Sequence, residues 1–326
     1  MPELNMVKAL NLALGEALRN DDNVVLLGED IGQDEGVFRV TEGLLAEFGP
    51  DRVIDTPLAE AGIVGTAVGM ALYGLRPVCE MQFSGFAYQA YHQIEGHVCR
   101  YRNRTRGRYH LPMVVRMPYG GGIRAIEHHS ESREVIYAHT PGLKMVICSG
   151  PRNARALLAA AIQDPDPVIF FEPKAVYRAF REDVPDEPET LPIGKAQVVQ
   201  PGTDVTIIAY GAMMRPALEA AAELADTDGA SVEVIDLLTM SPMDTDTIVG
   251  SVSKTGRALV VHEAPRTCGM GAEVSARIME TCLEHLEAPV RRVTGFDTHF
   301  PYFARERAYL PNAERIVHAA RDVLSF

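Results

Sequence analysis

Short apolar segments alternate with segments of helical periodicity along this chain. The alternating segments form two series, one after the other. Residues 24–27 and 167–171 are apolar without interruption, which is typical of strands buried on both faces of a parallel sheet. Residues 181–192 separate the two series and hold five acids and three prolines, a composition that predicts a linker. The sequence therefore predicts an α/β protein, with two doubly wound, mostly parallel α/β domains joined by an acidic Pro-rich linker. We expect domains at 1–180 and 196–326, with the linker at 181–195.

Composition narrows the classes of function. A chain of 326 residues can bury two cores of ordinary size, and a formal net charge of −13 argues against a nucleic-acid partner. No apolar run approaches the roughly 20 residues that span a membrane, and the first residues lack the pattern of a signal peptide. Five scattered cysteines without a C-x-x-C pair fit reduced thiols. We therefore expect a cytoplasmic protein.

The segment 53–74 contains a nearly uncharged helix with three glycines, Gly62, Gly65 and Gly69. Thr56 and Pro57 are typical of a helix start, and the apolar faces predict burial on all sides. Each glycine disfavours a helix, so we expect something to approach this helix closely. The one carboxyl group of its first turn, Glu60, has two interpretations. It either complements the helix dipole or is buried to hydrogen-bond a ring nitrogen of a ligand.

A glycine-rich loop at 117–132 carries two adjacent histidines, His128 and His129. Walker A, G-x-G-x-x-G, zinc-protease and G-x-S-x-G motifs are all absent from the sequence, which removes support for the common nucleotide, metal and hydrolase functions. A lone histidine is usually structural, but two histidines after a strand in such a loop favour proton transfer. Adjacent histidines converge poorly on one metal ion.

Two further features have both structural and functional interpretations. Phe86 follows a strand beside Gly85 and is either core packing or a platform on which a heteroaromatic ring stacks. The run from Arg100 to Arg108 holds five arginines in nine residues. It is either a solvated face with salt bridges, an oligomer interface or an anion site.

Several motifs occur together in one order. They are Asp-Thr-Pro-Leu-Ala-Glu ending at Glu60, Gln-Phe-Ser-Gly-Phe ending at Phe86, Glu-His-His-Ser around His129, His-Thr-Pro-Gly-Leu-Lys ending at Lys144, and Ile-Phe-Phe-Glu-Pro-Lys ending at Lys174. With them the chain resembles, over nearly its whole length, the β subunit of the E1 component of 2-oxoacid dehydrogenase complexes. That transketolase-like family depends on thiamine diphosphate and includes pyruvate, branched-chain 2-oxoacid and acetoin dehydrogenases.

The resemblance implies roles for matching residues. Glu60 would bind N1′ of the aminopyrimidine, and Phe86 would pack on the same ring, with Leu58 and Gln82 lining the pocket. His129 would act near the reacting carbon of the cofactor, and His128 is the weaker candidate. The resemblance also implies a structural potassium site formed by backbone carbonyls of Ala161, Asp164 and Asp166.

A missing motif implies partners. The thiamine diphosphate family holds Mg²⁺ through a Gly-Asp-Gly segment, which this chain lacks, so the resemblance implies that an E1 α subunit supplies the Mg²⁺ ligands in an α2β2 heterotetramer. Together with α, the chain would oxidatively decarboxylate a 2-oxo acid, pyruvate or branched-chain, and reductively acylate lipoyl-E2. The second partner would be the E2 dihydrolipoyl acyltransferase.

Departures from the family pattern concern the expected pairing with α, and alternative functions are weighed beside the E1 β function. His92 stands where relatives usually have aspartate, His299 replaces a usual proline, and the arginine run is denser than usual. The alternatives are another two-chain thiamine diphosphate enzyme, of split transketolase or synthase type, and a non-catalytic paralogue. The presence of both Glu60 and His129 argues against the last.

Overall fold

The computed structural model describes residues 2–326 and divides into two packing units. The first contains the chain up to residue 119 together with 136–193, and the second contains 120–135 together with 194–326. Both units are α/β, which confirms the predicted fold class. The loop with the two histidines packs with the second unit, although it lies between strands of the first in sequence. We describe each unit by itself.

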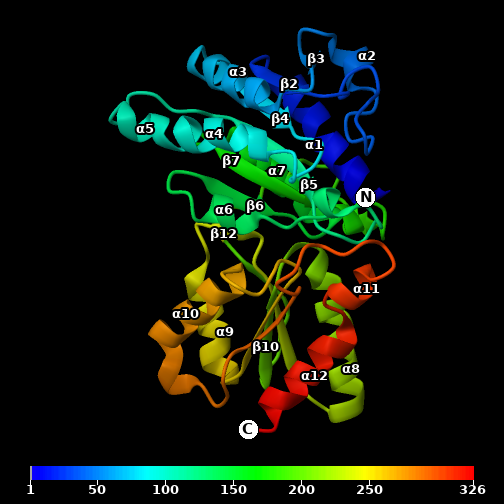
Figure 1. Cartoon of the computed structure of the whole chain (residues 1–326), viewed down its shortest axis with the longest axis vertical. Coiled ribbons are helices and arrows are strands. Elements are labelled where there is room, and N and C mark those ends of the chain that lie inside the picture. The colour runs from blue at the N-terminus through cyan, green and yellow to red at the C-terminus, as the bar shows by residue number, and fades with distance from the viewer. Residues whose placement is uncertain (1) are drawn as a thin grey trace. The chain divides into compact units, whose positions relative to one another are not determined.

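The sheet of the first unit is parallel. Its strands lie in the order β6-β7-β5-β4-β2-β3, and every neighbouring pair among these six runs in the same direction (Figure 1). Strands β2, β5 and β7 are buried along their whole length because helices cover the sheet, as the apolar segments predicted. They are β2 (Val24–Gly28), β3 (Val53–Asp55), β4 (Arg76–Glu80), β5 (Val114–Tyr119), β6 (Lys144–Ile147) and β7 (Val168–Pro173), and a separate antiparallel pair joins β1 (Glu3–Leu4) to β8 (Glu182–Asp183).

Two helix pairs cover this sheet. Helix α1 packs along α7, and α3 packs along α4, as Figure 1 shows. The helices of the unit are α1 (Met6–Asn20), α2 (Leu44–Phe48), α3 (Glu60–Leu72), α4 (Tyr88–Gly96), α5 (Tyr101–Arg104) and α7 (Pro151–Gln163), with short 3-10 turns at Val98–Arg100 and Lys174–Val176. Helix α6 (Glu134–Ala138) lies where the chain passes from one unit to the other.

Helix α3 differs from its prediction in two ways. It begins at Glu60, and Thr56 and Pro57 belong to the preceding extended segment, so the predicted cap and first turn are wrong. The helix is also buried on one face only, where Ile63, Val64 and Ala67 lie. A Cβ atom on Gly69 would meet no atom within 4 Å. A Cβ atom on Gly62 would lie 3.5 Å from Ala59 and one on Gly65 would lie 3.7 Å from Gln93 of α4, which are ordinary contacts. No described residue therefore approaches these glycines closely enough to require them.

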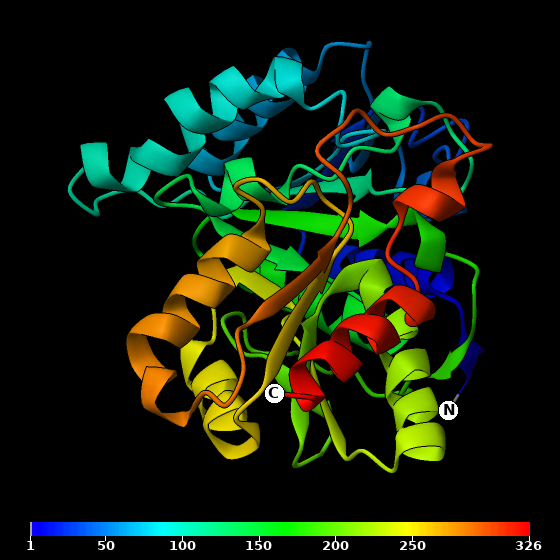
Figure 2. The same cartoon turned by 60° about the horizontal axis from the view of Figure 1, so that its bottom comes forward.

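The second unit repeats the architecture with fewer strands. Its sheet has the order β14-β13-β10-β11-β9, in which β9 is an antiparallel edge strand and the other pairs are parallel. Figures 1 and 2 show α9 and α10 on one face of the strands and α8 and α12 on the other. The strands are β9 (Gln197–Gln200), β10 (Val205–Ala209), β11 (Val232–Asp236), β12 (Thr239–Ser241), β13 (Ala258–His262) and β14 (Arg291–Thr294). The helices are α8 (Met214–Asp228), α9 (Thr245–Thr255), α10 (Met270–Cys282), α11 (Glu306–Tyr309) and α12 (Ala313–Leu324), with 3-10 turns at Glu127–His129, Gly211–Met213 and Leu283–His285.

A buried ion-pair network crosses the middle of the first sheet. The Arg116 guanidinium on β5 contacts Glu80 on β4 and forms two 2.6 Å hydrogen bonds to Glu172 on β7. The Tyr177 hydroxyl donates to Glu172 at 2.6 Å. All three charged residues are at most 5% exposed. Two carboxylates on either side of one guanidinium keep the pKa of Arg116 raised against its desolvation.

The acidic segment 181–192, which follows the first series of strands in the sequence, packs on the first unit. Arg155 of α7 contacts the backbone carbonyl of Pro185, and Arg152 pairs with Glu189 at 2.7 Å. Across residues 2–326, none of the helices combines the length and the apolar character that crossing a membrane requires.

Candidate cofactor site and histidine loop

Two buried acids lie at the carboxyl edge of the first sheet. Strands β2 and β3 pair in parallel with Gly28 opposite Asp55, and the Thr56 amide donates to the Gly28 carbonyl at 2.9 Å. The next residue after β2 is Glu29, and Glu60 opens α3 shortly after β3. Their exposed fractions are 6% and 3%. In open α/β sheets this edge is where ligands bind.

Each of these acids leaves one buried oxygen unsatisfied. Oε1 of Glu29 and Oε2 of Glu60 have no hydrogen-bond partner among the described residues. Burial, followed by the nearby Glu60 and Asp30 carboxylates, raises the pKa of Glu29 above its ordinary value. Burial and the nearby carboxyl groups both disfavour ionisation of Glu29. The sequence analysis does not select Glu29. An acid directly after a buried strand, at the same end of the sheet as Glu60, is the signal that could have identified it.

The other predicted cofactor residues lie in the same unit. The Gln82 side-chain amide donates to the Asp30 carboxylate at 2.8 Å, and Asp30 is the residue that follows Glu29. The half-buried ring of Phe86 meets Phe83 edge-on, with centroids 5.4 Å apart. Leu58 is 75% exposed, so within this chain little covers it. A polar acceptor, an aromatic ring and an exposed apolar side chain suit a heteroaromatic ligand.

The segment of the predicted potassium site follows α7. The Asp164 amide donates to the carbonyls of Ala160 and Ala161, and Lys144 Nζ lies 2.7 Å from both Asp164 carboxylate oxygens. Arg102 pairs with Asp166. The side-chain charges of this segment are therefore already compensated by cations of the chain itself. Backbone ligation of potassium stays a prediction.

The histidine loop is built within the second unit. It begins with Gly120, whose positive φ of +79° is in the left-handed region and whose amide donates to the Glu131 carbonyl at 3.1 Å. His129 is half-buried in a 3-10 turn, and its amide donates to Ile126 at 3.1 Å. His128 Nδ1 lies 3.5 Å from Glu131, which gives this histidine a structural contact. The structure thus gathers the four cofactor candidates in one unit and places both histidines in the other.

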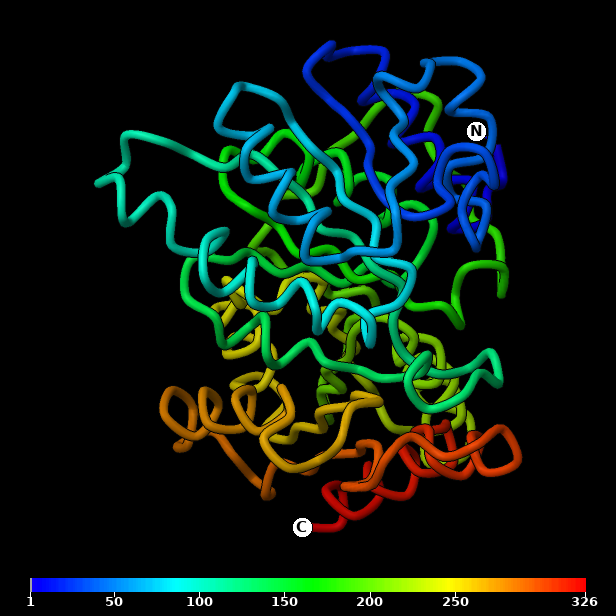
Figure 3. Tube along the Cα trace, turned by 45° about the horizontal axis from the view of Figure 1, so that its top comes forward, coloured from blue at the N-terminus to red at the C-terminus, as the bar shows by residue number. Residues whose placement is uncertain are grey.

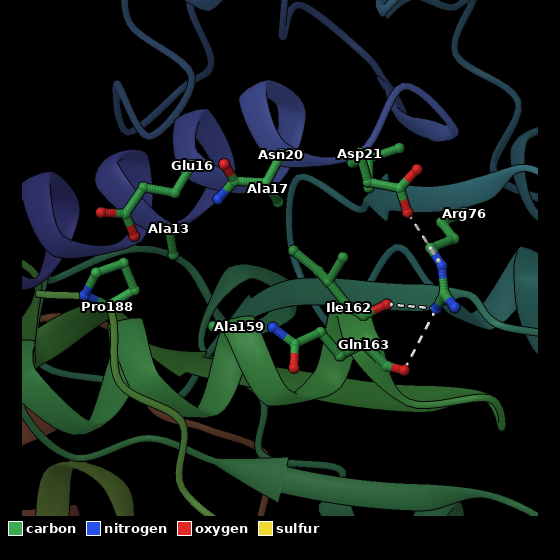
Figure 4. Close-up of a pocket in the computed structure, with 11 residues that line it drawn as sticks. Ala13, Glu16, Ala17, Asn20, Asp21, Arg76, Ala159, Ile162, Gln163 and Pro188 are labelled. Carbon is green, nitrogen blue, oxygen red and sulfur yellow. Dashed lines mark hydrogen bonds and ion pairs between the residues drawn. The ribbon is translucent and has the colours of Figure 1, made fainter.

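Two cavities show where open space lies. A cavity of about 280 Å³ lies in the first unit between α1 and α7. Figure 4 shows the residues that line it. Arg76 lies at its rim, pairs with Asp21 at 3.3 Å and donates to the Ile162 and Gln163 carbonyls. Because this cavity lies at the amino ends of β2 and β4, it is not the expected cofactor edge. In the second unit a cavity of about 570 Å³ adjoins the loop residues 130–133.

The three sequence departures have separate surroundings. The rings of His92 and His97 lie 6.4 Å apart at 82°, both from the region of α4. In the arginine run, Arg100 pairs with Glu95 and Arg102 with Asp166, which favours the salt-bridged face for these two members. His299 lines the cavity of the second unit.

Comparisons with known proteins identify the family. The family description "Transketolase, pyrimidine binding domain" matches residues 2–179, and "Transketolase, C-terminal domain" matches residues 194–316. The chain is 49% identical over 323 residues to the pyruvate dehydrogenase E1 component subunit beta of Acholeplasma laidlawii, covering 99% of this chain and 98% of that one. It is also 49% identical over 326 residues to the protein of that name from Bacillus subtilis strain 168, covering 100% of both.

A solved structure shows the same fold. It is described as a split gene transketolase, an inactive beta4 tetramer, and it superposes with a TM-score of 0.80 over 99% of each chain at 23% sequence identity. At that identity the likeness concerns the fold alone. From the two domain matches and the full-length similarity at about half identity, the chain belongs to the family of pyruvate dehydrogenase E1 component β subunits, which combine a transketolase pyrimidine-binding domain with a transketolase C-terminal domain.

Proposed function

We propose that this chain supplies the pyrimidine-binding half of a thiamine diphosphate site in a pyruvate dehydrogenase E1. The single observation that carries the proposal is the buried Oε2 of Glu60, which lacks a partner among residues 2–326 at the ligand edge of the first sheet. A buried polar atom without a partner costs free energy unless a ligand satisfies it. The ring nitrogen N1′ of the cofactor is a polar group that can form a hydrogen bond with this carboxyl group.

The residues of the first unit have distinct roles in this proposal. Glu60 holds the hydrogen bond to N1′, and Glu29, whose pKa is raised by burial, lies near it. Phe86 packs on the pyrimidine ring, while Gln82 and Leu58 border the pocket. When bound, thiamine diphosphate supplies the electron sink for decarboxylation of a 2-oxo acid. The chain's own groups bind, orient and hold protons.

His129 is the proposed proton-transfer residue of the second unit. An unperturbed imidazole changes charge near neutral pH, so it can serve both decarboxylation and the later acyl transfer. His128 is the weaker candidate because it lies 3.5 Å from Glu131. The acceptor of the acyl group is proposed to be the lipoyl group of an E2 dihydrolipoyl acyltransferase. The domain borders that we propose in sequence stay at 1–180, 181–195 and 196–326.

A partner chain is part of the proposal. We propose an E1 α subunit that holds Mg²⁺ and the diphosphate, in an α2β2 assembly, with potassium near Ala161, Asp164 and Asp166. The open glycine face of α3 supports a partner, because an apolar helix is usually covered on all sides. Leu58 is exposed just before this helix.

A substitution pair tests the partner. Gly69 of α3 and Gly250 of α9 are both exposed and lie inside helices, and a Cβ atom added to either would meet nothing within 4 Å. Gly69→Leu should leave the isolated chain folded and prevent assembly with α, as sedimentation would show. Gly250→Leu is the matched control and should assemble normally. Normal assembly of Gly69→Leu contradicts the proposed interface.

Pyruvate is the proposed substrate, because the relatives reported above are named for pyruvate dehydrogenase. Branched-chain 2-oxo acids are the alternative, since one methylene changes discrimination by only about 1–3 kcal/mol. The alternatives stay another two-chain thiamine diphosphate enzyme, of split transketolase or synthase type, and a non-catalytic paralogue. One split gene transketolase shares the fold at 23% identity, and a non-catalytic paralogue has no use for Glu60.

The decisive experiment co-expresses this chain with its α partner. Thiamine diphosphate, Mg²⁺ and an artificial electron acceptor are supplied with pyruvate, 2-oxobutyrate, the three branched-chain 2-oxo acids or acetoin. We expect turnover of pyruvate that requires both chains, and loss of turnover in Glu60→Gln with assembly intact. Unchanged turnover in Glu60→Gln contradicts the role of Glu60. Lipoyl-E2 in place of the artificial acceptor then tests reductive acylation.

A further inference from the structure

The glycine loop that leads to the histidines passes through a narrow gap in the second unit. A Cβ atom on Gly120 would lie 2.5 Å from Oε1 of Glu263, and one on Gly121 would lie 2.5 Å from Cζ of Phe300. Both distances are far below an ordinary contact. The loop therefore uses glycine because a carboxylate and an aromatic ring approach its backbone, and Figure 3 shows the loop beside the segment 296–305.

Glu263 also binds the loop directly. Its Oε2 accepts a hydrogen bond of 2.8 Å from the Gly121 amide, and its side chain is buried, with the residue 4% exposed. Glu263 follows β13 immediately, so its backbone is set by the sheet. A carboxylate bound to a backbone amide forms a charge-assisted hydrogen bond, which is stronger than a neutral one.

The rest of the loop has two further fixed points in the same unit. The Arg124 amide donates to the Glu306 carboxylate at 3.1 Å, and the Tyr210 hydroxyl donates to Glu134 at 2.7 Å. Burial, and next the charge of Glu263, raises the pKa of Tyr309 to about 12. The loop of 120–135 is thus held at its beginning, middle and end by side chains of the second unit.

We propose that Glu263 is a positioning residue for the reaction, which acts by fixing Gly120 and Gly121 and so sets the position of His129. The inference rests on the proposed role of His129. The second unit thereby has a role in the reaction, namely the placement of the loop that carries His129. A displacement of about 1 Å in such a group can lower a rate by on the order of 100-fold.

The first test replaces Glu263 in the assembled α/β enzyme. Glu263→Ala should lower kcat on the order of 10-fold to 100-fold with little change in KM, because the loop position changes and substrate binding does not. Glu263→Gln keeps an acceptor oxygen and should restore most of the rate. Glu273→Ala is the matched control, because Glu273 pairs with Arg277 on the surface of α10. It should behave as wild type.

The second test has a readout apart from activity. Hydrogen–deuterium exchange of a peptide covering 120–131 should be faster in Glu263→Ala than in wild type and in Glu273→Ala, since the Gly121 amide loses its acceptor. Unchanged exchange overturns the proposal. If Glu263→Ala does not fold, Gly121→Ala provides the same displacement through Phe300, and Phe300→Val should rescue it by making room. A failure of that rescue also overturns the proposal.

A double-mutant cycle separates this inference from the proposed function. If Glu263 acts through His129, then Glu263→Ala should have no further effect on kcat in a His129→Ala background. A full, multiplicative effect in that background overturns the inference. Full activity of His129→Ala alone overturns the proposed role of His129, and the exchange measurement then still decides whether Glu263 fixes the loop.

Discussion

The first unit contains two groups of buried acids that differ in how they are satisfied. Glu80 and Glu172 bind one guanidinium in the middle of the sheet, and Arg116 makes hydrogen bonds to both. Glu29 and Glu60 lie at the carboxyl edge of the same sheet, and each retains a buried oxygen without a partner in residues 2–326. Burial alone therefore does not separate a structural acid from a functional one. For these four acids of the first sheet, the difference lies in whether every buried oxygen has a partner.

This difference has a physical basis. A buried charge costs several kcal/mol unless it is paired and hydrogen-bonded, so the central network is stable only as a whole. The edge acids can reduce their cost by holding a proton or by binding a ligand. The first group therefore supports folding, and the second group is a cost to folding that a ligand offsets. Four measurements test or sharpen this comparison.

The largest expected effect comes from removing the shared cation. Arg116→Leu leaves two carboxyl groups buried without their partner, so the free energy of unfolding should fall by about 3–5 kcal/mol. Urea unfolding of the isolated chain measures the change. Arg215→Leu breaks an exposed pair with Glu219 and serves as the control, with almost no change in midpoint. Equal effects of the two variants would show that the central network does not stabilise the fold as expected.

A buried histidine in the second unit gives the next effect. His262 is fully buried and stacked on Tyr210, and burial, followed by Arg292 and Arg266, lowers its pKa to about 4. The unfolded value is about 6.5, so the neutral form favours folding. Its contribution is fully present above pH 6.5 and is lost as pH falls towards 4, by about 3 kcal/mol in all.

Urea midpoints between pH 4 and pH 7 measure this loss. His262→Phe keeps an aromatic ring against Tyr210 and should flatten the pH dependence over that interval. An equally steep dependence in His262→Phe would show that other groups cause it.

The raised pKa of Glu29 predicts a smaller effect of opposite sign. An acid whose folded pKa is raised stabilises the fold only in its protonated form, so stability falls as pH rises from the ordinary value through the raised one. Glu29→Gln mimics the protonated form. Its unfolding midpoint should therefore exceed that of wild type by an amount that grows as the pH rises above 4.5. A constant difference across this range would mean that Glu29 carries no raised pKa.

Much of the fold follows from local sequence. The apolar strands and the helices between them are predicted because burial on both faces demands continuous apolar residues, as in β2 and β7. Glu60 was identified because a single acid interrupts an uncharged helix. The start of α3 was predicted wrongly from Thr56 and Pro57, since these residues satisfy local rules that the extended chain after β3 overrides.

Other features depend on partners distant in sequence. Arg116, Glu80 and Glu172 are single charges in apolar strands, and their pairing exists only once the sheet has formed. The sequence shows the loop glycines but not why they are needed. The reason is the close approach of Glu263 and Phe300, which are distant in sequence. Glu29 was missed because an acid after a strand is usually a turn residue.

The most direct test of the central claim compares Glu60→Leu with Glu172→Leu. If Glu60 is kept for a ligand, Glu60→Leu should leave the urea midpoint of the isolated chain unchanged or raise it, because an unsatisfied buried oxygen is removed. Calorimetric titration of the α/β assembly with thiamine diphosphate and Mg²⁺ should then show that this variant has lost most of its binding. Glu172→Leu should lower the midpoint. A lowered midpoint for Glu60→Leu together with normal cofactor binding would contradict the account.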